Sequence, residues 1–391
     1  MVTSAPIRVA FNHVSRRLWA GGYNYQRNLF AALNRYCPGT IEPVLFAGSK
    51  DDSEEIAALG SIPAVEVVQS PAFDRAGTAL WSAIAFGIDG PAVAEFHSRH
   101  VDIVFESARF FGWRLPFPAI AWFPDFQHRQ LPHLFSRRAY WRRDLGFRVQ
   151  MASARHIMLS STSALDDLRK FYPGSANGVS VVRFATEPAA RLLAANALNV
   201  VNQYDLPQRF FYLPNQFWRH KNHQIVINAL GLLKQRGIDA VVVASGSTYD
   251  PREPSYFEST MRQVQVRGLD SSFRHLGLIP LEHVYALLRT SMALINPSRC
   301  EGWSTTVEEA KSFGVPMILS DLDVHREQTG GVERYFSADD AQALADQMLA
   351  VAEETQTIIV RDLQPDVDRR TRKFVADFVL LVQSTLRGEA S

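Results

Sequence analysis

The chain has 391 residues, more than one hydrophobic core usually holds, so two domains are expected. Hydrophobic residues make up 47% and charged residues 21%, the balance of an ordinary globular protein. The net charge is +1, which gives no indication of nucleic-acid binding. Two cysteines are too few for a disulfide framework, and the sequence shows neither a signal-peptide pattern nor an apolar run near the roughly 20 residues that span a bilayer. We therefore expect a cytoplasmic protein that binds no nucleic acid.

Short apolar runs alternate with longer helical patterns, which indicates parallel α/β construction. In the first half of the chain, strands are expected over residues 7–11, 43–46, 101–105, 119–122 and 156–159. The first strand is followed by a loop with Gly21 and Gly22 and then by a helix that has Tyr25, Leu29, Leu33 and Tyr36 on one side. Thr162 is expected to cap a later helix.

The alternation pauses over residues 185–208, where no strand is visible, and we place an interdomain linker there. It then restarts, with strands expected over residues 210–213, 240–243, 272–275, 292–295 and 316–319 and a final helix near 370–387. The sequence thus predicts two Rossmann-like, doubly wound domains facing across a ligand-binding cleft. The predicted bounds are 1–190 for the N-terminal domain, 205–365 for the C-terminal domain and 366–391 for a C-terminal helix.

Residues 301–309 carry the most informative pattern. An apolar strand ends at Pro297, Glu301 follows in a hydroxyl-rich turn, and the next helix has Glu309 in its first turns. Exposed backbone N–H groups and the positive end of a helix dipole would then lie between two carboxylates. Such a site suits a ligand that is anionic in the middle and hydroxylated at both ends, as a nucleotide-diphosphate sugar is.

Several other chemistries lack their motifs. The sequence has no Gly-x-Gly-x-x-Gly after the first strand, no P-loop and no Gly-x-Ser-x-Gly elbow. The histidines show no metal-ligand spacing with the two cysteines, and Asp321-Leu-Asp323 fits helix capping better than metal binding. We expect neither a cofactor nor a metal.

Two motifs in the second half resemble those of the retaining glycosyltransferases of family 4, which have the GT-B fold. They are Asn296-Pro-Ser-Arg-Cys-Glu-Gly-Trp303 and Glu309-Ala-Lys-Ser-Phe-Gly-Val-Pro316, followed by Ser320-Asp321. The hallmark of that family is two glutamates separated by seven residues, which Glu301 and Glu309 match.

Three further loops are similar to those of the family. Asn215–His223 resembles the first loop of its C-terminal domain, Gly277-Leu278-Ile-Pro280 resembles its nucleobase loop, and Gly21-Gly22 matches the glycine-rich loop of its N-terminal domain. The resemblance is strong from about 210 to 325 and weak before that. It also implies that the final helix packs back on the first domain.

The resemblance implies roles for the charged residues. Glu309 should accept hydrogen bonds from the ribose hydroxyls, and Glu301 should contact the transferred sugar, at its hydroxyls or at the charge developing on the anomeric carbon. Lys221, one of only six lysines, should stabilise the diphosphate as a leaving group. The alternative is that all three are ordinary surface charges. Glu308 is interpreted as the acid of a capping box that begins at Thr305.

One departure from the family affects the phosphate site. The family often has Gly-Arg where this chain has Asn215-Gln216, so Arg219 is a candidate replacement for the usual arginine. The backbone N–H groups of Trp303, Ser304, Thr305 and Thr306 would complete the phosphate cradle.

The N-terminal half offers two candidates for the acceptor and sugar side of the site. In Ala121–His128, Pro124 stands where the family often has histidine, but Asp125 and His128 remain as candidate catalytic residues. A capping aspartate and an ordinary surface histidine explain them equally well.

Residues 129–155 hold seven arginines against one acid, Asp144, with aromatic residues between them. This composition is typical of a peripheral contact with anionic lipid on the inner face of a membrane, or with a lipid-linked diphosphate acceptor. A solvated helix with buried aromatic residues is the alternative.

These features predict a retaining, metal-independent transferase that moves a hexose-type sugar from a nucleotide-diphosphate donor to a hydroxyl of a glycan or lipid-linked acceptor, in cell-surface polysaccharide synthesis. Retention is implied by the resemblance, through a front-face mechanism in which the leaving phosphate oxygen takes the acceptor proton. Two alternatives stay open. One is a catalytically degenerate, donor-binding partner subunit, and the other is a nucleotide-sugar epimerase or phosphorylase of the same fold.

Overall fold

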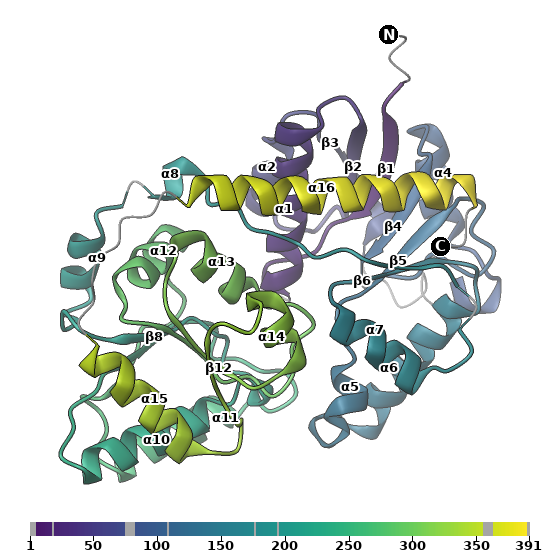
Figure 1. Ribbon diagram of the computed structural model, residues 1–391. Coiled ribbons are helices and arrows are strands. Elements are labelled where there is room, and N and C mark those ends of the chain that lie inside the picture. Colours follow the sequence, from purple (N-terminus) through teal and green to yellow (C-terminus); the bar gives the residue numbers. More distant parts are fainter. Residues whose placement is uncertain are drawn as a thin grey trace. The chain divides into compact units, whose positions relative to one another are not determined.

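The computed structural model describes residues 5–17, 19–74, 83–107, 109–175, 177–193, 195–354 and 363–388. The chain divides into two compact units (Figure 1). Unit 1 comprises Met1–Phe126, Arg137–Ala185 and Asp368–Ser391, and unit 2 comprises Gln127–Ser136 and Thr186–Val367. Each unit contains one parallel sheet with helices packed on it, so the predicted α/β fold with two Rossmann-like sheets is confirmed.

Seven parallel strands form the sheet of unit 1 in the order β3-β2-β1-β4-β5-β6-β7. They are β1 (Ile7–Asn12), β2 (Ile41–Ala47), β3 (Glu66–Gln69), β4 (Ile103–Ser107), β5 (Ala119–Phe123), β6 (His156–Leu159) and β7 (Val179–Val181). Every residue of β4 and β5 is buried, which is why β5 and the first three residues of β4 read as apolar runs, although β4 ends in the buried polar residues Glu106 and Ser107.

The helices of unit 1 are α1 (Ala20–Tyr36), α2 (Ser53–Gly60), α4 (Gly90–Ser98), α6 (Arg137–Met151), α7 (Thr162–Phe171) and most of α16 (Gln364–Arg387), with the 3-10 turn η1 (Pro71–Phe73). The cap of α7 is Ser161, whose Oγ accepts from Ala164 N at 2.9 Å, so the prediction that Thr162 caps this helix is wrong by one residue. Helix α16 packs on the sheet of unit 1 through Phe378, whose ring centre lies 6.2 Å from that of Phe11.

Six strands form the sheet of unit 2 in the order β10-β9-β8-β11-β12-β13. They are β8 (Phe211–Leu213), β9 (Val242–Ala244), β10 (Phe273–His275), β11 (Leu294–Asn296), β12 (Met317–Ser320) and β13 (Arg334–Phe336). Its helices and turns are α5 (Gln127–Gln130), η2 (Pro132–Leu134), α8 (Ala190–Leu193), α9 (Ala197–Gln203), η3 (Arg219–Lys221), α10 (His223–Gln235), α11 (Tyr256–Val266), α12 (Leu281–Thr290), α13 (Thr305–Phe313), α14 (Asp323–Thr329) and α15 (Ala341–Glu353).

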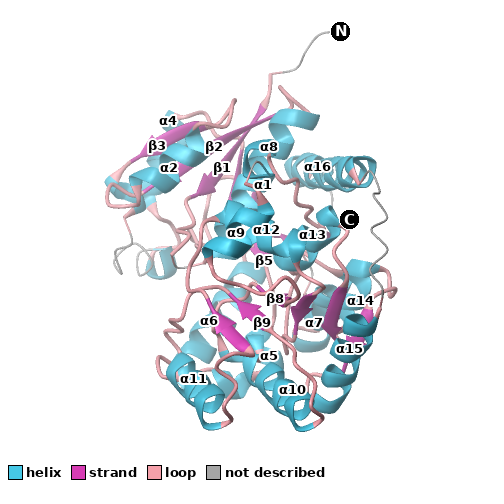
Figure 2. Ribbon diagram, turned by 90° about the vertical axis from the view of Figure 1, so that its left-hand side faces the viewer, coloured by secondary structure: helices cyan, strands magenta, loops and turns pink. Residues whose placement is uncertain are grey.

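The sheet of unit 2 lies between two apolar cores. Alternation along β8 directs Phe211 and Leu213 into one core and Tyr212 into the other. Helices α10, α11 and α15 cover the first face, and α9, α12 and α13 cover the second (Figures 1 and 2). This leaves the carboxyl ends of the strands to carry the loops, where ligands bind in such sheets.

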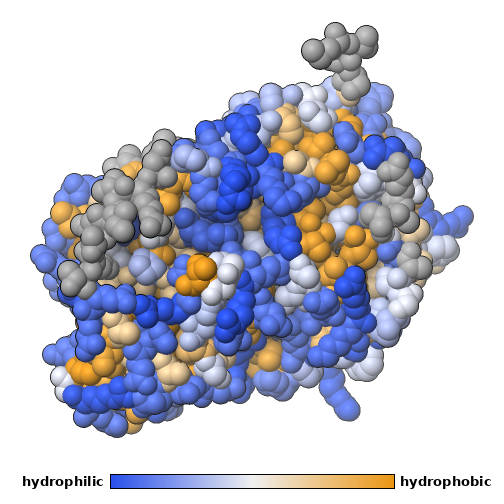
Figure 3. Space-filling view, in the orientation of Figure 1, coloured by the Kyte–Doolittle hydropathy of each residue, from blue (hydrophilic) through white to orange (hydrophobic). Residues whose placement is uncertain are grey.

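The face of the molecule in Figure 3 carries mainly hydrophilic side chains with smaller apolar areas between them, as is usual for a globular surface. Of the helices in the described ranges, none is long and apolar enough to cross a membrane.

Candidate functional site

Lys221 and Glu301 come together at the carboxyl edge of the unit 2 sheet. Lys221 follows β8 and Glu301 follows β11, and these two strands are neighbours in the sheet. Because carboxyl ends of parallel strands meet at one edge, the two loops converge. Lys221 Nζ donates to Glu301 Oε1 at 2.6 Å, and the side chains are only 16% and 9% exposed.

Glu301 is held in its ionised form. Burial is the largest single influence and acts to raise its pKa, but the charges of Lys221 and His325 and the hydrogen bonds from Lys221 and Ser298 together outweigh it, so the pKa lies below its ordinary value. One of those hydrogen bonds comes from Ser298 Oγ, which donates to Glu301 Oε1 at 2.6 Å. The result is a fixed carboxylate beside a fixed ammonium group.

Asn296, the last residue of β11, organises the turn that follows it. Its Nδ2 donates to Ser304 Oγ at 2.9 Å and to Thr306 Oγ1 at 3.4 Å. Its Oδ1 accepts from Ser298 N at 3.3 Å and lies 2.7 Å from Ser298 Oγ. One fully buried amide therefore holds both ends of the loop that contains Glu301.

Helix α13 begins at Thr305, directly after this turn. Ser304 precedes it and is fastened by Gln328, whose Oε1 accepts from Ser304 N at 3.1 Å and whose Nε2 donates to Ser304 O at 2.8 Å. The N–H of Ser304 is thus used within the protein. The N–H groups of Thr305 and Thr306 lie in the first helical turn, where no intrahelical acceptor exists and the helix dipole is positive.

Glu308 has a structural role, although not the predicted one. Helix α13 starts at Thr305 rather than being capped by it, so the capping-box interpretation is wrong. Glu308 is 1% exposed, and its Oε1 accepts from Lys311 Nζ at 2.8 Å and from Gln328 Nε2 at 3.0 Å. It therefore ties α13 to α14.

Glu309 lies one residue further along α13 and is 6% exposed. Burial raises the pKa of Tyr212, the middle residue of β8, and the negative charge of Glu309 contributes to that rise. Glu309 therefore lies near β8, an interior strand of the sheet, in line with the packing of α13 on Tyr212. The hydroxyl of Tyr212 lies 2.7 Å from Ser245 Oγ, just beyond β9.

The loop predicted to hold the nucleobase follows β10. Gly277 has φ +72°, its N–H donates to His275 Nε2 at 3.2 Å, and its carbonyl accepts from Gly246 N at 2.9 Å. Leu278 is 78% exposed, and Trp303 in the Glu301 turn is half-buried.

Arg219 lies in η3 with its side chain 55% exposed, and its Nη1 is 3.1 Å from Glu253 Oε2. An exposed pair of this kind contributes little to stability, so it leaves the arginine able to change partners. Its role at the phosphates stays a prediction.

The two N-terminal candidates have different surroundings. Asp125 Oδ1 accepts from Arg143 Nη2 at 2.7 Å, within unit 1. His128 is fully buried in α5, a segment that groups with unit 2, so the alternative of a surface histidine is wrong. The catalytic roles of both stay predictions.

Gly21 and Gly22 lie in the first turn of α1. A Cβ at Gly22 would lie 2.4 Å from the Trp19 ring, so only glycine allows this indole to pack there. Trp19 in turn stacks on Trp122 of β5, with 5.1 Å between ring centres.

Two residues of the site were missed by sequence reasoning. Asn296 stood inside one of the two motifs, and its place at the end of a strand was the available signal. Gln328 offered none, because its partner Ser304 is far away in the sequence.

No three His, Cys, Asp or Glu side chains within the described ranges are grouped so that they could hold a metal ion.

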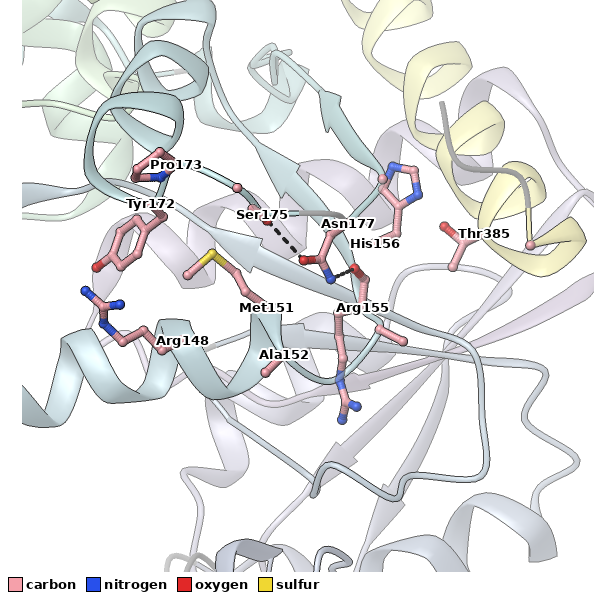
Figure 4. Close-up of a pocket in the computed structure, with 14 residues that line it drawn as sticks. Arg148, Met151, Ala152, Arg155, His156, Tyr172, Pro173, Ser175, Asn177 and Thr385 are labelled. Atoms are coloured by element: carbon pink, nitrogen blue, oxygen red, sulfur yellow. Dashed lines mark hydrogen bonds between the residues drawn. The ribbon is translucent and has the colours of Figure 1, made fainter.

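A cavity of about 740 Å³ lies in unit 1, between the C-terminal end of α6, the start of β6 and the end of α16 (Figure 4). Arg148, His156, Asn177 and Thr385 are among its lining residues, and none of the predicted site residues lines it.

Residues 199–368 match the family model described as "Glycosyl transferases group 1". The chain is 27% identical over 205 residues to the putative glycosyltransferase EpsF of Bacillus subtilis, covering 47% of this chain and 48% of that protein. It is 23% identical over 227 residues to the O-antigen chain mannosyltransferase RfbU of Salmonella typhimurium, covering 56% of each. The chain thus spans about half the length of these curated relatives.

The structure is similar to that of Anabaena Alr3699/HepE in complex with UDP and glucose, with a TM-score of 0.69 at 15% identity over 97% of this chain and 100% of that one. At this identity the likeness shows the fold alone. The predicted GT-B fold is therefore confirmed, and so is the resemblance to group 1 glycosyltransferases, over residues 199–368. Assignment to family 4 stays a prediction.

Proposed function

We propose that this protein is a retaining, metal-independent glycosyltransferase that moves a hexose-type sugar from a nucleotide-diphosphate donor to a hydroxyl of a glycan or lipid-linked acceptor. The observation that carries the proposal is the pairing of Lys221 with Glu301 beside the start of α13. It brings a cation, a carboxylate and helical N–H donors to one edge of the sheet, which are the groups that a diphosphate and a sugar require.

The donor would bind along this edge. Glu309 would accept hydrogen bonds from the ribose hydroxyls, the N–H groups of Thr305 and Thr306 would receive phosphate oxygens, and Lys221 would stand beside the leaving diphosphate. The match to group 1 glycosyltransferases, and a structural relative solved with UDP and glucose, support a nucleotide-sugar donor.

In the proposed reaction the bond between the anomeric carbon and the diphosphate oxygen breaks, and the bond to the acceptor oxygen forms on the same face. The acceptor proton moves to the leaving phosphate oxygen. Lys221 would stabilise the charge that grows on the diphosphate, and Glu301 would stabilise the positive charge that grows at the anomeric carbon. In the structure the two groups hold each other and Ser298 holds Glu301, so donor binding would first exchange this ion pair for contacts with the ligand.

The first experiment is thermal unfolding against a panel of nucleoside diphosphates and nucleotide sugars, in EDTA and with divalent metal. A ligand at about 100 times its dissociation constant stabilises by about 2.7 kcal/mol, which shifts Tm by several degrees. Stabilisation by one base family in EDTA is the expected result. No shift with any nucleotide would contradict the proposal.

Turnover then separates the remaining alternatives. Incubation of the stabilising donor with candidate hydroxyl acceptors should release nucleoside diphosphate and form a glycoside with the anomeric configuration of the donor, as seen by NMR. Binding without turnover would favour a donor-binding partner subunit. Conversion of the donor without any acceptor would favour an epimerase.

A peripheral contact with anionic lipid is part of the proposal, because a lipid-linked acceptor would be held at a membrane surface. Helix α6 supports it with one exposed face, on which Trp141 is 62% and Leu145 56% exposed beside exposed Arg137, Arg138 and Arg142. Other arginines of this region pair with acids within the protein: Arg143 with Asp125, Arg148 with Asp144 and Arg155 with Glu106. The inner face of the cell membrane would be the site of action.

A further inference from the structure

The loop that follows β9, residues 245–255, packs against the loop that follows β8, residues 214–222. Phe217 N donates to Ser247 O at 2.8 Å. At Gly246, where φ is +147°, a Cβ would lie 2.6 Å from a carbonyl oxygen of the β8 loop, so the two backbones approach as closely as glycine allows. The loop that contains Lys221 is therefore packed directly against the loop that follows β9, and the β9 loop contains Arg252.

Arg252 is held rigidly by its own loop. Its Nε donates to Asp250 Oδ1 at 3.0 Å and its Nη2 donates to Asp250 Oδ2 at 3.0 Å, a two-pronged contact with a carboxylate that is 1% exposed. Such a pair fixes the plane of the guanidinium group. Because Asp250 matches its charge, Arg252 is suited to positioning rather than to binding a phosphate.

The remaining terminal nitrogen of the Arg252 guanidinium group contacts the segment 127–136. Arg252 Nη1 donates to Gln127 Oε1 at 2.8 Å, and the guanidinium carbon lies 5.6 Å from the centre of the Phe135 ring. Gln127 is 6% exposed and precedes the buried His128, a candidate catalytic residue. Arg252 thus holds both ends of the segment that carries His128.

The same guanidinium group contacts the loop that ends in Lys221. Its carbon lies 5.2 Å from the Trp218 ring centre, and its Nη2 lies 3.4 Å from His220 Nδ1. The carbonyl oxygen of His220 accepts from Arg299 N at 2.8 Å, so this turn is also joined to the loop of Glu301.

We propose that Arg252 is a positioning residue of the transfer reaction, which fixes the loop of Lys221 and docks the segment of His128 on unit 2. The proposal rests on the proposed function. A lysine at position 252 keeps the charge but lacks the planar fork, so it cannot hold Asp250 and Gln127 together. This separates a geometric role from a purely electrostatic one.

Docking is tested first by amide hydrogen exchange of the full chain without ligand, followed by mass spectrometry of peptides. Arg252→Ala and Arg252→Lys should raise exchange in both 127–136 and 216–222. Gln127→Ala should raise it in 127–136 only. Arg262→Ala, an exposed arginine on α11, is the matched control and should change neither segment. Unaltered exchange in both Arg252 variants would overturn the docking role.

Turnover and donor affinity form the second readout. Arg252→Ala and Arg252→Lys should lower kcat about 10²-fold, the size of effect that slight misplacement of reacting groups produces, and should weaken donor binding. Gln127→Ala should lower kcat and leave the donor dissociation constant unchanged. Wild-type kcat in a variant with raised exchange would refute the positioning role. If the wild-type protein transfers no sugar, the proposed function fails, and exchange still decides whether Arg252 docks the two segments.

Discussion

Lys221 Nζ and Glu301 Oε1 lie 2.6 Å apart, so each group already has a partner of opposite charge. A diphosphate would compete with Glu301 for the ammonium group, and a sugar would compete with Lys221 for the carboxylate. The proposed donor presents both at once. Its binding would therefore exchange one internal ion pair for two contacts with the ligand.

The first prediction concerns Lys221. Lys221→Ala should lower kcat by about 10²–10³-fold, because one electrostatic stabiliser of the leaving group is lost. Steady-state kinetics with the donor identified by thermal unfolding provides the measurement. The control is Lys373→Ala, an exposed lysine on α16 paired with Asp377, which should leave kcat unchanged. A loss below about tenfold would remove Lys221 from the proposed role.

The second prediction uses the depressed pKa of Glu301. A carboxylate whose folded-state pKa is lowered stabilises the fold above its ordinary value of 4.5, and this contribution disappears as pH falls through the folded pKa. Glu301→Gln lacks that contribution. The stability difference between wild type and variant should therefore be constant above about pH 5 and shrink below it. Urea unfolding of both proteins between pH 3 and pH 7 measures the difference in unfolding free energy. A difference that does not change with pH would contradict the prediction.

The third prediction concerns His223, which stacks on Phe217 with 3.9 Å between ring centres and is fully buried. Burial lowers its pKa to about 3. Between the ordinary value of 6.5 and the folded value, the unfolded chain binds a proton that the folded chain does not. Stability should therefore fall as pH drops below about 6.5, by up to about 1.4 kcal/mol per pH unit for this group.

The variant His223→Phe keeps an aromatic ring against Phe217 but cannot titrate. Its unfolding free energy should decline less steeply than that of the wild type between pH 6.5 and pH 4, as measured by urea unfolding. Equal slopes for the two proteins would show that His223 binds a proton as readily in the folded chain as in the unfolded chain, so that its pKa is not lowered.

The fourth prediction concerns Glu309. Glu309→Gln should weaken binding of a nucleoside diphosphate by about 10–100-fold, because hydrogen bonds to a charged group contribute about 1.5–3 kcal/mol. Isothermal titration calorimetry gives the affinity. Glu258→Gln, at an exposed position on α11, serves as the control and should bind like the wild type. Unchanged affinity in Glu309→Gln would place the ribose elsewhere.

The fifth prediction concerns the exposed face of α6. The protein should sediment with vesicles that contain anionic lipid and not with purely zwitterionic vesicles. Arg138→Ala should weaken the partition about fivefold, since one cation near such a surface contributes about 1 kcal/mol. Trp141→Ala should weaken it as well, and Val332→Ala, 83% exposed in unit 2, should not. Equal sedimentation with both kinds of vesicle would refute an electrostatic contact.

The interior strands of both sheets could be predicted because burial on two faces leaves a continuous apolar run. Three strands at sheet edges were not foreseen: β3, β7 and β13. Strand β7 has three half-buried residues, and β13 begins with Arg334 and Tyr335, so neither pattern differs from that of a loop. Short edge strands are defined by their neighbour, which sequence pattern alone does not reveal.

The candidate site also has a part that the sequence predicts and a part that it does not. Glu301, Glu309 and the turn between them lie within nine residues, so a local motif sufficed. Gln328 acts on Ser304 from 24 residues away, and Arg252 contacts Gln127 across 125 residues. Such contacts arise from the fold, and the spacing of residues in the sequence does not reveal them.

The side-chain amide of Asn296 also fixes the direction of the hydrogen bonds in the turn. Ser298 N–H can only donate, so Oδ1 must face it and Nδ2 must face the hydroxyls of Ser304 and Thr306. Each hydroxyl then receives one hydrogen and keeps its own to give away. The two oxygens are 3.1 Å apart, so one of these hydrogens is shared between them and the other is left for a further acceptor. The chain of hydrogen bonds therefore runs in one direction and ends in a donor, as suits an acceptor such as a phosphate oxygen.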